Sequence, residues 1–294
     1  MRKADIKNLV FKGGGVLGIA YAGAITVLEK NGILQQIERV AGTSAGAITA
    51  ALISLKYSAA EIKQVINSTD FKSFEDGWDP LRIPTKYGLY KGDAFLKWMH
   101  SIIVAKGLNT NATFLDFKNA GCHDLRVFAT DLNIQNMKMF SVQTTPHVVV
   151  AEAVRASMSI PMFFEAWKFT NNNPDDHIYV DGGTVYNFPI STFDNDDVNN
   201  SNTLGLFLEN LSGAPVVNHL NYDQMVDYVR ILFETVLNAQ VVDFDNDPIQ
   251  ESRTIRVDSL GMSAINFNLT NDQKTSLYNS GVECATKFVS QLTV

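Results

Sequence analysis

A serine bounded by two glycines, directly after an apolar run, is the feature that most restricts how this chain can fold. The segment Gly42-Thr43-Ser44-Ala45-Gly46 follows the apolar pair Val40-Ala41 and precedes small residues suited to a helix. It predicts a sharp strand-to-helix turn that exposes the Ser44 hydroxyl, because only glycine lets the flanking backbone pass so closely. Ordinary turns share the pattern, so a nucleophilic role for Ser44, with Gly42 and Gly46 forming the elbow, depends on context.

A second glycine-rich turn lies about thirty residues upstream. A short buried strand is expected over Asn8–Lys12; it leads into Gly13-Gly14-Gly15-Val16-Leu17-Gly18, and a helix is expected from Val16 to Asn31. Backbone N–H groups at such a turn can hold an anion. The anion is either a phosphate or the oxyanion of a tetrahedral intermediate.

The phosphate alternative can be tested against the residues. Gly13, Gly15 and Gly18 satisfy the dinucleotide pattern G-x-G-x-x-G, which also requires an acidic residue at the end of the second strand. Glu38 is in range but precedes that strand. We therefore favour an oxyanion hole for Ser44 formed by Gly13, Gly14 and Gly15, with nucleotide binding as the alternative.

The best candidate for a general base is an aspartate, not a histidine. Asp181 follows the apolar residues Ile178 and Val180 and precedes Gly182-Gly183, a pattern typical of a strand end with a free carboxylate. A plain Asp-Gly-Gly turn is the alternative. None of the five histidines has comparable turn residues around it: His100, His123, His147, His177 and His219.

In type, order and spacing, these three segments resemble the patatin-like phospholipase family. The resemblance covers about 8–190 and extends to the linking segments Ala129-Thr130-Asp131-Leu132, Arg155-Ala156-Ser157, Ile160-Pro161, Phe163-Phe164 and Asn187-Phe188-Pro189-Ile190. It implies a serine–aspartate dyad in which Ser44 is the nucleophile and Asp181 the base. It also implies a patatin-like three-layer architecture. One position departs from the family, because Leu17 stands where a basic residue is usual.

The order of elements predicts an α/β fold with a mostly parallel central sheet and helices on both faces, formed by a single domain over residues 1–294. Strands are expected at 125–130, 137–142, 203–208 and 254–257, and helices at 58–68, 94–105, 148–157, 221–242 and 271–292. Ser58 and Glu61 have the spacing of a capping box. Gly92-Asp93 suits a helix N-cap, so Asp93 is interpreted as structural rather than catalytic.

Composition excludes several function classes. The formal net charge is −7 and no cluster of basic residues is present, which argues against nucleic acid as a partner. No apolar run is long enough to span a membrane, and no signal peptide is evident. Cys122 and Cys284 lack metal-ligand spacing, so we expect no metal and no cofactor. The expected location is cytoplasmic or peripheral to a membrane, with export by another route left open.

The segment Phe71–Pro84 mixes aromatic residues with turn formers and is expected to be a long ordered loop. Its aromatic side chains could line an acyl-chain pocket, rest on a lipid surface as a lid, or anchor the loop to the core. The substrate surface is expected to be a membrane or micelle, contacted mainly through apolar groups because the protein is acidic.

The function expected from these features is a lipid acyl hydrolase of the phospholipase A or lysophospholipase type. Two alternatives stay open. One is a non-catalytic lipid-binding or scaffold protein with the same fold. The other is a Ser-Asp-His esterase using Ser44, Asp181 and His219, although an α/β-hydrolase serine normally follows more strands than the two available here.

Overall fold

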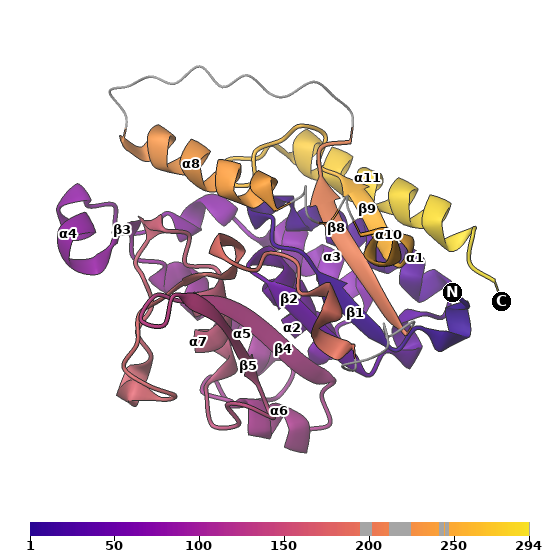
Figure 1. Cartoon of the computed structure of the whole chain (residues 1–294), viewed down its shortest axis with the longest axis horizontal. Helices are drawn as coiled ribbons and strands as arrows, with labels where there is room; N and C mark the ends of the chain where they lie inside the picture. Colours follow the sequence, from indigo (N-terminus) through magenta and orange to yellow (C-terminus); the bar gives the residue numbers. More distant parts are fainter. Residues whose placement is uncertain (195–201, 212–224, 241–243, 245–246, 294) are drawn as a thin grey trace.

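The computed structural model describes residues 1–194, 202–211, 225–240, 244 and 247–293. A seven-stranded sheet has the order β5-β4-β2-β1-β8-β9, and β7 also pairs with β4 (Figure 1). Its strands are β1 (Asn8–Phe11), β2 (Arg39–Thr43), β4 (Asp124–Asp131), β5 (Asn136–Ser141), β7 (Tyr179–Asp181), β8 (Thr203–Glu209) and β9 (Thr254–Asp258). Pairings among β4, β2, β1, β8 and β9 are parallel, whereas β5 and β7 run antiparallel to β4. The expected mostly parallel α/β sheet is confirmed.

Helices flank this sheet and connect its strands. They are α1 (Ile19–Lys30), α2 (Ala45–Ser54), α3 (Ala59–Ser68), α4 (Ile83–Lys86), α5 (Asp93–Ala105), α6 (Phe114–Asn119), α7 (Val150–Ser157), α8 (Met225–Ala239), α10 (Pro248–Ser252) and α11 (Asn271–Val289). The helix expected over 221–242 corresponds to α8, and residues 221–224 and 241–242 lie outside the described residues.

The two faces of the sheet are covered differently. Alternate strand residues such as Leu9 and Val40 join a large core with the apolar sides of α1, α2, α7 and α11. Val10 and Ala41 point to the opposite face and pack with Ile190 and Phe193 of the 3-10 helix η8 (Ile190–Phe193). This alternation follows from the two-residue period of a strand, which sends neighbouring side chains to opposite faces.

The C-terminal third completes the sheet and the helical layer. Strand β8 pairs with β1, and α11 packs against α1 so closely that a Cβ added to Gly23 would lie 1.9 Å from the Tyr278 carbonyl oxygen. A Cβ on Gly281 would lie 1.9 Å from the Ala20 oxygen. The termini also meet, since Lys3 N–H donates to the Thr293 carbonyl at 2.9 Å (Figure 1).

Local capping signals are partly confirmed. Ser58 and Glu61 form the expected capping box at the start of α3. The N-cap expected at Gly92-Asp93 is Gly92, and Asp93 is the first residue of α5. The Asp76 carboxylate accepts the backbone N–H groups of Gly92 at 2.6 Å and Ala94 at 3.0 Å. Because this acceptor lies 16 and 18 residues earlier in the chain, short-range sequence patterns could not identify it.

The segment over 71–84 contains more structure than expected. It holds the 3-10 helices η4 (Phe71–Phe74) and η5 (Pro80–Arg82) and leads through α4 to β3 (Gly88–Tyr90). Strand β3 pairs in parallel with β6 (Met162–Phe164), forming a second small sheet that sequence periodicity did not indicate. No helix in the described part of the chain is both long and apolar enough to cross a bilayer.

Candidate active site

Ser44 lies at the junction of β2 and α2 in a strained backbone conformation. Its φ is 53° and its ψ is −123°, values that a residue with a side chain rarely adopts. The flanking glycines are required sterically, because a Cβ on Gly42 would lie 2.3 Å from the Gly46 carbonyl carbon and one on Gly46 would lie 2.3 Å from the Phe11 oxygen. The tight strand-to-helix turn expected from Gly42–Gly46 is therefore present.

Strand register brings Asp181 to this turn. In the parallel pairing of β2 with β4, Thr43 lies opposite Phe128, and in the antiparallel pairing of β7 with β4, Asp181 lies opposite Ala129. A strand has two hydrogen-bonding edges, and β5 occupies one edge of β4 over residues 126–131. Strands β2 and β7 therefore both pair with the other edge of β4, β2 along residues 124–128 and β7 along residues 129–131. This places Ser44, which follows β2, beside Asp181, the last residue of β7.

The two side chains form a direct hydrogen bond. Ser44 Oγ donates to Asp181 Oδ2 at 2.6 Å, while Asp181 Oδ1 accepts the Gly183 N–H at 2.7 Å. Ser44 is 5% exposed and Asp181 is fully buried. Burial disfavours the charged carboxylate and raises the pKa of Asp181 to about 7, although the hydrogen bonds from Ser44 and Gly183 oppose this shift.

The glycine loop lies beside Ser44, and one of its three N–H groups is already hydrogen-bonded within the protein. Gly13 N–H donates to the Asn187 carbonyl at 3.0 Å, so this group, expected to help bind an oxyanion, is already engaged. Gly15 has a φ of 53° and lines the same pocket as Ser44. Within the described residues, the N–H groups of Gly14 and Gly15 have no hydrogen-bond acceptor. These two remain as donors for a bound anion.

Ser157 is a site residue whose role the sequence did not reveal. The Ser44 N–H donates to Ser157 Oγ at 2.8 Å, and the Ser157 hydroxyl donates to the Phe128 carbonyl. Ser157 is the last residue of α7 and is fully buried. A serine at a helix end is common, so only a resemblance to the family's Arg-Ala-Ser segment marked this position.

Asn187 is a second residue that the sequence marked only through a segment resembling the family, Asn187-Phe188-Pro189-Ile190. It is 1% exposed, and neither its Oδ1 nor its Nδ2 has a hydrogen-bond partner within the described part of the chain. A Cβ on Gly13 would lie 2.2 Å from Asn187 Oδ1 and 3.3 Å from Ser44 Cβ, so the carboxamide reaches the glycine loop next to Ser44. The Asn187 backbone is fixed by Gln240, whose Oε1 accepts its N–H at 2.8 Å.

Lys12 is a buried basic residue that directly precedes the glycine loop in the chain. Its Nζ donates to the Leu208 carbonyl at 2.8 Å and lies 4.5 Å from the centre of the Phe207 ring. Burial lowers the pKa of Lys12 to about 8. Leu17, which stands where the family usually has a basic residue, is buried in the apolar core. The Lys12 ammonium is thus held at β8 by a backbone oxygen.

An apolar pocket opens at Ser44. Its volume is about 40 Å³, and its walls include Gly15, Met158, Ile160 and Phe267 together with Phe71 and Phe74 of η4. Two of the aromatic residues expected in the 71–84 segment therefore line the site. The aromatic Trp78 and the aliphatic Leu81 of the same segment do not line it: Trp78 is 59% exposed and Leu81 is 83% exposed.

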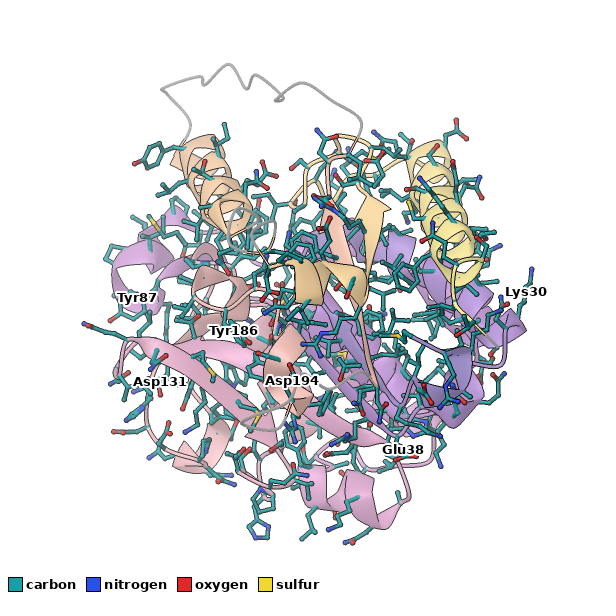
Figure 2. All side chains as sticks on the ribbon, turned by 45° about the vertical axis from the view of Figure 1, so that its right-hand side comes forward. Lys30, Glu38, Tyr87, Asp131, Tyr186 and Asp194 are labelled. Carbon is teal, nitrogen blue, oxygen red and sulfur yellow. The ribbon has the colours of Figure 1, made fainter. Side chains whose placement is uncertain are left out.

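Where the structure describes them, the histidines and Glu38 of the alternative sites form no hydrogen bond with Ser44. His219 lies outside the described residues. His177 Nδ1 and Asp131 Oδ2 form a hydrogen bond of 2.8 Å. Glu38 lies before β2, at the opposite end of the strand from Ser44, and Figure 2 shows it near the lower rim, well away from Tyr186 in the segment after Asp181. Glu38, the acidic residue considered among those the structure describes, is therefore not placed as the partner of a dinucleotide-binding glycine loop.

One group of described side chains has a geometry that could hold a metal ion. Ligand atoms of Asp131, Asp175 and His177 lie within 4.8 Å of one another. Their polar atoms already pair with each other and with the Tyr179 hydroxyl, which donates to Asp175 Oδ1 at 2.7 Å. We assign no ion to this cluster.

Comparisons with known proteins agree with this geometry. Residues 9–194 match the family model described as patatin-like phospholipase. An uncharacterized Bacillus subtilis protein, YqhO, is 40% identical over 199 residues, covering 63% of this chain and 65% of that protein. The uncharacterized mimivirus protein R571 is 28% identical over 99% of this chain and 96% of its own length. The probable lipid hydrolase 463L of invertebrate iridescent virus 6 is 27% identical over 63% of this chain and 62% of its own length.

Solved structures share the fold at lower identity. VipD from Legionella pneumophila superposes with a TM-score of 0.68 at 16% identity, covering 97% of this chain and 67% of VipD. The type III effector ExoU superposes with a TM-score of 0.53 at 17% identity, covering 97% of this chain and 53% of ExoU.

Proposed function

Because this chain belongs to the patatin-like phospholipase family, we propose that it is a lipid acyl hydrolase that cleaves fatty-acyl esters through a Ser44 acyl-enzyme. The observation that carries the proposal is the 2.6 Å hydrogen bond from Ser44 Oγ to Asp181 Oδ2 at a strained turn. A nucleophile in direct contact with a base is the arrangement that covalent catalysis requires. The proposed class is a phospholipase A or lysophospholipase.

The proposed reaction has two steps, acylation of Ser44 and hydrolysis of the acyl-enzyme. Asp181 accepts the hydroxyl proton as Ser44 Oγ attacks the ester carbonyl carbon, and the resulting oxyanion receives hydrogen bonds from the N–H groups of Gly14 and Gly15. Collapse of the tetrahedral intermediate expels the alcohol, which takes the proton from Asp181. A water molecule then attacks the acyl-enzyme with Asp181 again as base, releasing the fatty acid and restoring the Ser44 hydroxyl.

The electrostatics of Asp181 suit this role. A carboxyl group with an ordinary pKa is too weak a base to deprotonate serine efficiently, whereas burial raises the pKa of Asp181 to about 7. The Asp181 carboxyl is then half-ionised near neutral pH. In its ionised form it is a stronger proton acceptor than a carboxylate with an ordinary pKa. The same desolvation strengthens every hydrogen bond made to the developing negative charge.

The chemistry of the surroundings favours a lipid ester. The pocket at Ser44 is lined mainly by apolar side chains. The segment around α4 carries the exposed apolar residues Trp78, Leu81 and Tyr87, of which Tyr87 is labelled in Figure 2. We propose that this segment contacts a membrane or micelle through apolar groups, since the protein carries a formal net charge of −7. A cytoplasmic or peripheral membrane location fits this proposal.

Labelling with a fluorophosphonate, followed by peptide mapping, tests the assignment. Modification is expected at Ser44 in the wild type, none in Ser44→Ala, and a reaction slowed by at least about a hundredfold in Asp181→Asn, where the base is lost. Hydrolysis of lysophospholipid and of p-nitrophenyl esters should follow the same order.

Ser54→Ala is the matched control. Ser54 is also a buried serine at the end of a helix, and its hydroxyl donates to the His123 carbonyl at 2.7 Å, away from the site. Its labelling should equal that of the wild type. Equal labelling of Ser44→Ala and wild type would refute the assignment, and lipid binding without any labelling or hydrolysis would favour a non-catalytic lipid-binding protein.

A further inference from the structure

Two cavities approach each other on either side of the 3-10 helix η4. The first is the apolar pocket of about 40 Å³ at Ser44. The second, of about 330 Å³, lies between the end of α3, η4 and α5. Its walls combine apolar side chains such as Tyr57, Val65, Trp98 and Ile102 with the polar side chains of Ser68, Thr69, Asp70, Ser73 and Ser101. Among the residues that line either cavity, Phe74 alone lines both. Its side chain is therefore the partition between them.

The size of the inner pocket is a problem for a long acyl chain. A cavity of about 40 Å³ holds roughly three groups the size of a water molecule, since each needs about 10–15 Å³ by this measure. An acyl chain of twelve or more carbons is longer than this pocket can enclose. The larger cavity has about eight times the volume of the inner one, enough for the distal part of such a chain.

Phe74 is held as a partition by aromatic neighbours on both sides. Its ring centre lies 5.9 Å from that of Phe71, 5.4 Å from that of Phe95 and 5.5 Å from that of Trp98. Phe71 and Phe95 belong to the wall of the inner pocket, whereas Trp98 belongs to the wall of the outer cavity. The Trp98 Nε1–H donates to Thr69 Oγ1 at 3.0 Å, which fixes the outer side.

From this arrangement we propose that Phe74 sets the acyl-chain length accepted at Ser44, and that the outer cavity is the binding site for the distal part of a long chain. With the Phe74 ring in place, the site takes short acyl groups. Long chains bind when the ring moves aside or is removed, because the two cavities then become continuous. This inference rests on the proposed acyl-hydrolase function, since it assigns the substrate's chain to a specific path.

The kinetic test compares esters of different chain length. For p-nitrophenyl butyrate and dodecanoate, we expect Phe74→Ala to raise the ratio of kcat/KM for the long over the short ester by at least about tenfold. This corresponds to two further methylene groups buried, at about 0.8 kcal/mol each. Phe74→Leu, a milder change in a buried position, should shift the ratio in the same direction and covers the case in which the alanine variant does not fold.

Phe71→Ala is the matched control. Phe71 lies on the same 3-10 helix, contacts Phe74 and lines the inner pocket, but it is not part of the outer cavity. Its removal should enlarge the inner pocket without joining the two cavities, so the ratio should change much less than in Phe74→Ala. An equal shift in both variants, or no shift in the Phe74 variants, overturns the proposal.

A binding measurement separates this inference from the proposed reaction. In the Ser44→Ala background, where no turnover is expected, adding Phe74→Ala should raise the affinity for dodecanoate relative to butyrate by at least about tenfold. If the wild type cleaves no ester while this affinity change occurs, the proposed reaction fails and the chain path stands. If the wild type cleaves esters while neither readout shifts with Phe74, the chain path fails alone.

Discussion

The backbone N–H of Ser44 donates to the hydroxyl oxygen of Ser157 at 2.8 Å. The same hydroxyl donates to the Phe128 carbonyl of β4, so one side chain ties the strained turn to the neighbouring strand and to the end of α7. Ser44 thereby keeps an unfavourable backbone conformation because its surroundings hold it there. The orientation of Ser44, the proposed nucleophile, therefore depends on a hydrogen bond to a residue 113 positions away in the chain.

Replacing Ser157 by alanine removes a single hydroxyl group, yet it should impair ester hydrolysis at Ser44. The change removes the acceptor of the buried Ser44 N–H and the hydroxyl that donates to the Phe128 carbonyl. Leaving a buried polar group without a partner costs about 1–3 kcal/mol of unfolding free energy. We expect ester hydrolysis to fall by at least about tenfold as the turn relaxes. Ser54→Ala removes a comparable hydroxyl bonded to one carbonyl only, so similar activity losses in the two variants would argue against a positioning role for Ser157.

The pH dependence of hydrolysis should report Asp181. The base must be ionised to accept the Ser44 proton, and burial raises the pKa of this carboxyl to about 7. Activity measured as kcat/KM should therefore rise with increasing pH and reach half of its plateau near pH 7. A profile that is already flat from pH 5 upward would show that Asp181 titrates normally or is not the base.

The stability of the protein should also depend on the charge of Asp181. The folded state keeps the carboxyl proton up to about pH 7, whereas in the unfolded state an aspartate loses it near pH 4. The contribution of this group to the free energy of unfolding is therefore complete below about pH 4 and falls by about 1.4 kcal/mol per unit as the pH rises to about 7.

Asp181→Asn removes this titration. Between pH 5 and pH 7, denaturant unfolding should show the wild type losing about 2–3 kcal/mol relative to the asparagine variant. Above pH 7 the difference should become constant, since both states are then ionised. A difference that does not change with pH would mean that Asp181 is not buried as a titrating group.

Gly15 and Gly107 allow a matched test of the glycine loop. Both have positive φ values, 53° and 82°, so alanine is strained at either position. At Gly107 the added Cβ meets open space, whereas at Gly15 it would lie 1.9 Å from the Ala264 carbonyl oxygen. Gly107→Ala should lower stability by about 1–2 kcal/mol and leave fluorophosphonate labelling unchanged. Gly15→Ala should abolish labelling, and normal labelling in that variant would remove the loop from the proposed oxyanion site.

Treating residues 1–294 as a single domain leads to a prediction about truncation. A fragment ending at residue 194 retains the family match but lacks β8, β9 and α11, which leaves the edge of β1 and the packed face of α1 uncovered. We expect this fragment to aggregate or to lack a cooperative thermal transition, while the full chain unfolds in one step. A fragment that unfolds cooperatively would establish a separate N-terminal domain.

The parts of the site that depend on neighbouring residues could be predicted from the chain. The turn at Gly42–Gly46 and the glycine loop were expected because the backbone geometry needed there is one that glycine provides. The capping box at Ser58 was expected for a similar reason, since its donors and acceptors lie within one helical turn. In contrast, the caps formed by Asp76 and the acceptor formed by Ser157 are long-range contacts that no local pattern encodes.

By itself, the sequence determined the strand-to-helix turns, the alternation of strands and helices, and the pair of residues best suited to acyl-transfer chemistry. Only the tertiary structure decided that Ser44 and Asp181 touch, because that contact depends on two strands sharing one edge of β4. It also decided that Gly13 N–H is occupied and that Phe74 separates two cavities. Short-range interactions depend on sequence spacing, whereas contacts between distant residues depend on how whole elements pack, which is resolved only when the chain is folded.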